Sequence, residues 1–197
     1  MKKTAIMTDS NCGLMPVDGS RLGIYVIPMP VLVDDQTYYE GQDITVEEFY
    51  KKLSEGAKVS TSQPSPGDVM EMWNRLLKDY DEVVYIPMSS GLSSTYQNAS
   101  LLAQEEPYAG KVYVVNNHRI SVTQAQSALD AKLLADQGKN GAYIKRILEE
   151  ESMDATIYIV VDTLEYLKKG GRITPAVSAI GSMLNLKPVL TIQGEKL

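Results

Sequence analysis

The fold is indicated most clearly by residues 82–96, which have the sequence EVVYIPMSSGLSSTY. The first six residues form a short, mostly apolar run of strand length. A stretch rich in serine and threonine follows, and a helical pattern begins where that stretch ends. We therefore expect the hydroxyls at the carboxyl end of a strand and the amino end of a helix, which is where open α/β sheets bind ligands.

That position favours an anion, because free backbone N–H groups and the positive end of the helix point toward it. Five hydroxyls can donate to the anion without adding charge, from Ser89, Ser90, Ser93, Ser94 and Thr95. Serine is also the usual N-cap of a helix. These residues alone leave an anion site and a plain helix cap both open.

The composition is that of an ordinary globular protein, since 44% of the 197 residues are hydrophobic and 22% are charged. The net charge of −6, without a cluster of Lys and Arg, argues against nucleic acid as a main partner. One cysteine, Cys12, and one histidine, His118, exclude an internal disulfide and a zinc site of the usual ligand set. No apolar run approaches the ~20 residues of a membrane helix. We expect a cytoplasmic protein without a metal or an integral membrane segment.

Strands and helices alternate along the chain, which predicts a parallel sheet covered by helices on both faces. The expected strands are residues 4–7, 23–27, 82–87, 112–115, 155–161 and 187–192, with a hairpin around Asp34-Asp35-Gln36. The expected helices begin at or near Thr45, Ser65, Ser121, Ala142, Leu164 and Thr174.

The helix expected from Ser121 illustrates how the core positions are chosen. Ser121 and Gln124 have the spacing of a capping box, as do the pairs at Thr45 and Ser65. The helical spacing predicts that its inner face is formed by Val122, Ala125, Leu129 and Leu133.

The regular pattern predicts two units, an N-terminal α/β domain over residues 1–153 and the start of a second α/β domain over residues 154–197. The last expected strand is followed by a Gln-Gly turn without a return strand. Because an unpaired sheet edge is normally covered or charged, we expect an amino-terminal portion of a longer protein. An edge paired between subunits is the alternative.

No assembled catalytic group is evident in the sequence. The phosphate-binding patterns Gly-x-Gly-x-x-Gly and Gly-x-x-x-x-Gly-Lys are missing, and residues 91–95 lack the second glycine of a Gly-x-Ser-x-Gly elbow. A serine triad would have to use His118 as its base. Asp9 and Ser10 could contact a ligand, but they are also common turn residues. The hydroxyls that remain are suited to holding an anion rather than transforming it.

Five motifs, in this order, resemble the DegV family of bacterial fatty-acid-binding proteins. The motifs are Thr8-Asp9-Ser10, residues 60–64 (STSQP), residues 89–96 (SSGLSSTY), residues 167–173 (LKKGGRI) and Leu186-Lys187-Pro188. The resemblance covers the whole chain. It implies two α/β domains with a lipid tunnel between them, in which a long-chain fatty acid lies with its carboxylate toward the surface.

The resemblance also implies a role as the lipid-binding subunit of a two-component fatty acid kinase. Such a subunit is not catalytic by itself and needs no cofactor. It presents the bound carboxylate to a separate ATP-binding kinase subunit, which forms an acyl phosphate for phospholipid synthesis.

Carried over to this sequence, the resemblance implies that Thr61 and Ser93 bind the carboxylate, with Ser62 and Ser94 as near alternatives. It places Arg172 near the tunnel mouth or at the partner-docking surface, whereas the residue's own context indicates a turn. Family members differ at residues 116–121, and they run on for roughly eighty residues past the last residue here, as the size of two complete domains suggests. The histidine that closes the family's carboxylate site lies in that part, so His118 does not replace it.

Two other functions stay open. One is a small-molecule hydrolase or transferase that uses Ser93 with His118. The other is a regulatory protein that senses lipid without a kinase partner.

Overall fold

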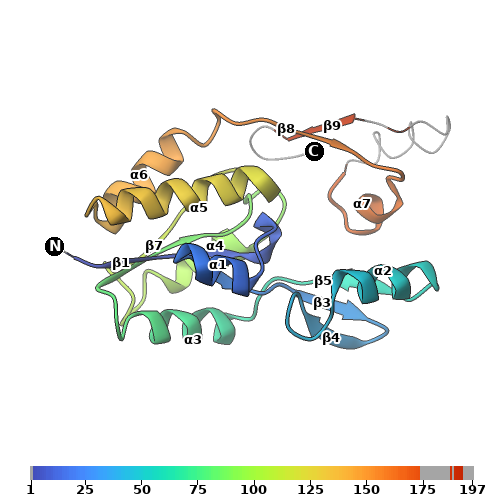
Figure 1. The fold of residues 1–197 in the computed structure, drawn as a ribbon, viewed down its shortest axis with the longest axis horizontal. Coiled ribbons are helices and arrows are strands. Elements are labelled where there is room, and N and C mark those ends of the chain that lie inside the picture. The colour runs from blue at the N-terminus through green and yellow to red at the C-terminus, as the bar shows by residue number, and fades with distance from the viewer. Residues whose placement is uncertain (1, 174–186, 188, 193–197) are drawn as a thin grey trace.

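The computed structural model describes residues 2–173, 187 and 189–192. Its largest sheet has four parallel strands in the order β2-β1-β6-β7 (Figure 1). The bounds of these strands are Thr4–Asp9 for β1, Tyr25–Ile27 for β2, Glu82–Ile86 for β6 and Val112–Val114 for β7. The parallel sheet predicted from the alternating pattern is therefore present, and its carboxyl edge carries the serine-rich stretch.

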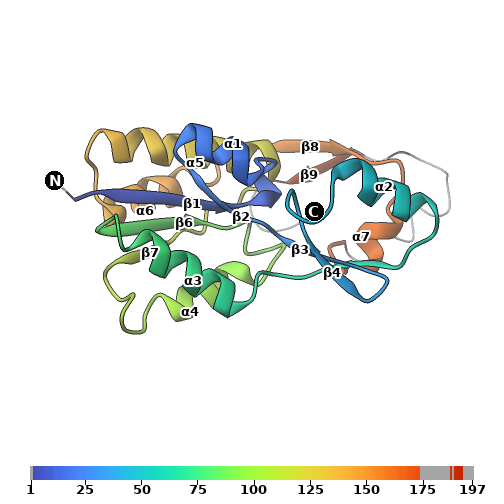
Figure 2. The same ribbon diagram turned by 60° about the horizontal axis from the view of Figure 1, so that its bottom comes forward.

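Helices cover both faces of this sheet, as the sequence predicts (Figures 1 and 2). Met7 of β1 packs in one core cluster with Trp73, whereas its neighbour Ile6 packs in another with Ala128 and Ile144. Successive strand residues point to opposite faces, so the two clusters lie on opposite sides of the sheet. One face carries α3 (Pro66–Leu76) and α4 (Thr95–Leu102), and the other carries α1 (Pro16–Leu22), α5 (Ser121–Asp136) and α6 (Gly141–Glu150).

A second, antiparallel sheet lies beyond the carboxyl edge of the first (Figure 2). Its order is β4-β3-β5, with β3 at Pro30–Val33, β4 at Gln36–Tyr39 and β5 at Val59–Thr61; α2 (Val46–Ser54) packs beside it. Asp34 and Asp35 form the predicted hairpin turn, with φ angles of 50° and 68°. The sequence did not predict the third strand, β5, because it is short and two of its three residues are polar.

A third sheet pairs β8 (Ile157–Val160) with β9 (Val189–Ile192) in antiparallel register. A short helix, α7 (Glu165–Lys169), follows β8. Tyr158 and Val160 are exposed on this sheet. The predicted domain boundary near residue 153 stays a prediction, and the helix expected from Thr174 lies outside the described residues.

The expected inner face of α5 was wrong. Val122 is 68% exposed and Leu133 is 59% exposed. The buried residues of this helix are Gln124, Ser127, Ala128 and Ala131. Three of these four side chains are small, so the helix can approach the sheet closely and the larger apolar residues are left on its outer side.

Two of the three expected capping boxes are confirmed. Thr45 exchanges hydrogen bonds with Glu48 at the start of α2, and Ser65 does so with Asp68 at the start of α3. The third is absent, because the N-cap of α5 is Ile120 and makes no side-chain cap bond.

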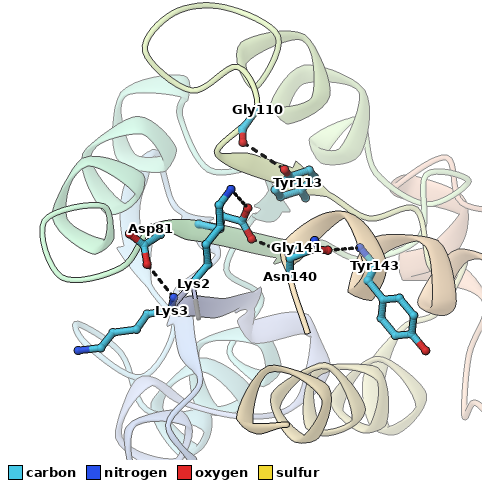
Figure 3. A network of polar contacts seen from close by, with 9 residues as sticks. Lys2, Lys3, Asp81, Gly110, Tyr113, Asn140, Gly141 and Tyr143 are labelled. Atoms are coloured by element: carbon cyan, nitrogen blue, oxygen red, sulfur yellow. Dashed lines mark hydrogen bonds and ion pairs between the residues drawn. The ribbon is translucent and has the colours of Figure 1, made fainter. Parts of the chain in front are cut away.

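A buried carboxylate joins three elements at the amino end of the parallel sheet. Glu82 is 1% exposed, and its carboxylate accepts a 2.6 Å hydrogen bond from Lys2 Nζ and a 2.7 Å bond from the backbone N–H of Gly141. In Figure 3, dashed lines join this carboxylate to Lys2 and to Gly141, and Tyr113 lies nearby. Because Gly141 is the first residue of α6, the carboxylate binds the positive end of that helix.

Candidate ligand-binding site

The two hydroxyl-rich segments meet at a small polar cleft. The cleft has a volume of about 120 Å³ and is lined by Thr61, Ser62, Ser93 and Arg172, among others. Four of the five residues that the family resemblance selects are thus brought together. Ser94 lies outside the cleft and is exposed, because it is the N-cap of α4 and follows the turn that directs Ser93 inward.

Ser93 is positioned by the turn that follows β6. Its backbone N–H donates to the carbonyl of Ser89, and its Oγ accepts a 3.2 Å bond from the N–H of Thr95. Ser93 Oγ also lies 2.8 Å from Thr95 Oγ1. When Thr95 is the donor in that pair, the proton of Ser93 is free for an anion in the cleft.

Thr61 and Ser62 supply the opposite wall. Thr61 ends β5 and faces Val31 of β3 across the antiparallel ladder. Neither hydroxyl has a hydrogen-bond partner in the described part of the chain, and both residues are exposed. The next residue, Gln63, accepts a 3.0 Å bond from Asn98 of α4, which fixes this wall to the other one.

Arg172 brings a positive charge to the same cleft. Its Nε donates to the carbonyl of Leu92 at 3.3 Å, and a second guanidinium nitrogen donates to the carbonyl of Gly170. These bonds confirm that Arg172 solvates a turn, and its place at a tunnel mouth or a partner-docking surface stays a prediction.

An apolar chamber opens beside the polar cleft. Its volume is about 400 Å³, within the range of small-molecule sites. Most of its wall is apolar, from Met15, Val31, Ile44, Val46, Phe49 and Tyr50. The chamber and the cleft share Val31, Glu40 and Thr61, so the two spaces adjoin at these residues.

Asp9 bonds two residues that line the cleft, Asn11 and Met88. It is fully buried and accepts bonds from the N–H of Met88 at 2.9 Å, the amide of Gln124 at 3.0 Å and the N–H of Asn11 at 3.1 Å. Burial raises the pKa of its carboxyl, and these hydrogen bonds oppose that rise. Asp9 therefore links the loops after β1 and β6.

His118 does not join this site. The residue lines neither cavity, and its backbone has a φ of 51°. Its Nδ1 is buried, and no partner for it lies within the described residues. The described hydrogen bonds of Ser93 go to Thr95 and Ser89 rather than to His118.

Sequence reasoning missed two polar residues of this region. Glu40 lines both cavities, and Gln124 donates to Thr8, Asp9 and the carbonyl of Ile86. Gln124 was missed because the large apolar residues of α5 indicated the opposite side of the helix as its inner face. Nothing in the local sequence distinguishes Glu40 from a surface residue.

The described part of the chain shows neither of two other kinds of site. No helix in residues 2–173 has the length and apolar character that a bilayer crossing requires. No group of three or more His, Cys, Asp and Glu side chains in the described ranges could hold a metal ion.

Neutral hydroxyl donors and the cation Arg172 thus border a polar cleft that adjoins an apolar chamber within an α/β fold. The chain belongs to the DegV family, whose model, described as one of uncharacterised proteins, matches residues 3–197.

Named relatives and solved structures agree with this assignment. A DegV domain-containing protein of Caldanaerobacter subterraneus is 35% identical over 191 residues, which cover 97% of this chain and 68% of the relative. One from Deinococcus radiodurans is 34% identical over 191 residues, covering 96% of this chain and 67% of the relative.

Two solved structures share the fold over 100% of this chain. A structure described as fatty acid binding of a DegV family protein from Thermus thermophilus has a TM-score of 0.86 and 36% identity, with 69% of that chain covered. DegV from Bacillus subtilis, described as a fatty acid binding protein, has a TM-score of 0.85 and 28% identity, with 70% of that chain covered.

Proposed function

We propose that this protein binds a long-chain fatty acid, with the carboxylate in the polar cleft and the acyl chain in the apolar chamber. The observation that carries this proposal is that the two spaces adjoin at Val31, Glu40 and Thr61. An elongated ligand with one anionic end matches both spaces at once. The description of the Thermus thermophilus and Bacillus subtilis structures as fatty acid binding supports the same ligand class.

We assign the carboxylate contacts to Thr61, Ser62 and Ser93, because their side chains line the cleft. Ser94 is left out, since it lines neither cavity. Arg172 borders the cleft and offers a charge that an incoming carboxylate meets at the surface.

The magnitudes suit an anchor made mainly of neutral hydroxyls. Burial of methylenes stabilises the complex by about 0.8 kcal/mol each, so a ~16-carbon chain yields at most about 12 kcal/mol before the costs of binding. Each hydroxyl bond contributes about 1 kcal/mol, or somewhat more to a charged oxygen. The head group therefore needs orientation more than it needs affinity.

We further propose that the protein acts in the cytoplasm and presents the carboxylate to a separate ATP-dependent kinase subunit, which forms the acyl phosphate. In this role the chain has no catalytic group or cofactor of its own. A few hydroxyl bonds leave a carboxylate oxygen able to attack ATP, whereas a bidentate arginine clamp would compete with that attack.

The first test is solvent extraction of freshly purified full-length protein, followed by mass spectrometry of the lipid. We expect about one equivalent of fatty acid per chain. A stably folded protein that contains no lipid and does not take up added palmitate would overturn the proposal. A substrate screen around Ser93 would then be the next step.

Two variants then test the assigned contacts. Ser93→Ala and Thr61→Val should each weaken palmitate binding by about fivefold, the effect of one hydrogen bond. Ser94→Ala is the matched comparison and should bind as the unchanged protein does. Equal losses in Ser93→Ala and Ser94→Ala would contradict the assignment of the contact to Ser93.

A further inference from the structure

Glu40 is the acidic side chain that borders both the polar cleft and the apolar chamber in the described part of the chain. It lies where the two spaces adjoin, together with Val31 and Thr61. Its backbone N–H donates to the carbonyl of Met29 at 3.2 Å, which fixes the chain just after β4. A ligand that extends from the cleft into the chamber must pass this carboxylate.

The orientation of Glu40 follows from the hydrogen bonds of Ser10. Ser10 is buried, and its Oγ accepts a 2.9 Å bond from the N–H of Met29. Ser10 Oγ lies 2.5 Å from Glu40 Oε2. A hydroxyl has one proton, so Ser10 donates it to Glu40. Within the described residues the other carboxylate oxygen has neither a donor nor an ion pair, and it can accept a bond from a ligand.

We propose that Glu40 selects fatty acids with a hydroxyl close to the carboxyl group, the α- and β-hydroxy acids, by accepting a hydrogen bond from that hydroxyl. This inference rests on the proposed function. With the carboxylate in the cleft beside Thr61 and Ser93, the first carbons of the chain lie where the two spaces adjoin. A hydroxyl on one of them reaches Glu40, whereas a hydroxyl at the far end of the chain does not.

The energetic reason is the loss of water around Glu40 when a ligand fills the site. A carboxylate that loses water without gaining a donor is destabilised, and an unsubstituted acyl chain brings no donor. A ligand hydroxyl restores a charge-assisted bond. The proton of this hydroxyl also lies between two negative charges, those of Glu40 and of the ligand's own carboxylate. Arg172 supplies the positive charge of the cleft.

The test compares palmitate, β-hydroxypalmitate and ω-hydroxypalmitate by calorimetric titration of the delipidated full-length protein. We expect β-hydroxypalmitate to bind about tenfold more tightly than palmitate, as one hydrogen bond to a charged acceptor would give. The ω-hydroxy acid should gain nothing. It has the same composition as the β-hydroxy acid, so it controls for polarity and solubility.

The variant Glu40→Gln separates the role of the acceptor from that of the side chain's size. Its amide oxygen can take the place of Oε2 beside Ser10, which turns the NH₂ group, a donor, toward the ligand. A ligand hydroxyl can still accept a bond from this NH₂ group, but that bond is neutral. The variant should therefore reduce the preference for β-hydroxypalmitate and bind palmitate at least as tightly as the unchanged protein does. Glu47→Gln, the same change on an exposed residue of α2, should keep the preference.

Each outcome decides between the two proposals. Equal binding of palmitate and β-hydroxypalmitate by the unchanged protein would overturn the inference and leave the proposed function standing. A preference of undiminished size in Glu40→Gln would also overturn it. Failure of every acid to bind the folded protein would overturn the proposed function and this inference with it.

Discussion

Replacing Glu82 by glutamine should lower the free energy of unfolding by about 2 kcal/mol. The carboxylate accepts bonds from Lys2 Nζ and from the N–H of Gly141, and its side chain is 1% exposed. Glutamine has one acceptor oxygen, so it can satisfy one of these two donors, and its NH₂ group faces the other.

The magnitude follows from the surroundings of each donor. The Lys2 side chain is 60% exposed and can turn to water, so losing this ion pair costs little. Water cannot replace the bond from the N–H of Gly141 as easily, because this bond is buried. In the variant, the acceptor of the bond is a neutral amide oxygen instead of a carboxylate. A bond to a charged group contributes about 1.5–3 kcal/mol and a neutral one about 1 kcal/mol. The charge also stabilises the start of α6 by about 0.3–1 kcal/mol.

Urea denaturation followed by tryptophan fluorescence measures this loss, because Trp73 is buried in the core. The expected fall in Tm is roughly 4–8 °C for a chain of this size. Glu150→Gln is the matched control, since Glu150 pairs with Arg146 on the same helix and both side chains are more than half exposed. That control should change the free energy of unfolding very little, because the pair is exposed to water. Equal losses in the two variants would refute the role assigned to the buried carboxylate.

Three further predictions test other parts of the structure. Gly141→Ala should destabilise the fold by about 1–3 kcal/mol in urea titrations, because a Cβ there would lie 2.3 Å from Tyr113 Cδ2. Arg172→Met should weaken palmitate binding by about fivefold and reduce its dependence on salt, whereas Lys168→Met, also exposed but outside the cleft, should change neither. Asp9 should make the free energy of unfolding fall as pH rises. Burial raises its pKa in the folded protein above the usual 3.8 of the unfolded chain. Between the unfolded and the folded pKa, the folded chain therefore holds a proton that the unfolded chain has lost. Asp9→Asn should remove this slope when the unfolding free energies of both proteins are measured across acidic pH.

The parallel sheet could be predicted because its strands are buried on both faces. Residues 82–87 form an apolar run, and so do residues 112–115. In the antiparallel sheet, the hairpin of β3 and β4 was predicted from its turn residues, but the third strand was not. This strand, β5, has the sequence Val59-Ser60-Thr61, in which two of three residues are polar and exposed. That strand exists because Val31 and Val33 of β3 pair with it, and this long-range pairing leaves no local pattern.

The helix α5 shows a second limit of periodicity. Its leucines at positions 129 and 133 have the spacing of a buried face, yet both are exposed. Burial was decided by the close approach of Ala128 and Ala131 to the sheet, and by the bonds that Gln124 makes to the ends of β1 and β6. A pattern of large apolar residues cannot reveal a contact that depends on small ones.

The residues of the candidate site differ in whether the sequence could identify them. Thr61 and Ser93 were selected through the family resemblance of their motifs, because clustered hydroxyls at the start of a helix are equally typical of a helix cap. Glu40 was not available, because its role depends on the position of Ser10 and on two cavities lined by segments that are far apart in the sequence. This difference matters for selectivity. In the proposed function, the hydroxyls would bond any carboxylate and define the class of ligand, whereas the Glu40 carboxylate beside the first carbons of the chain would discriminate among members of that class. The residues that set selectivity are therefore expected where the cleft and the chamber adjoin.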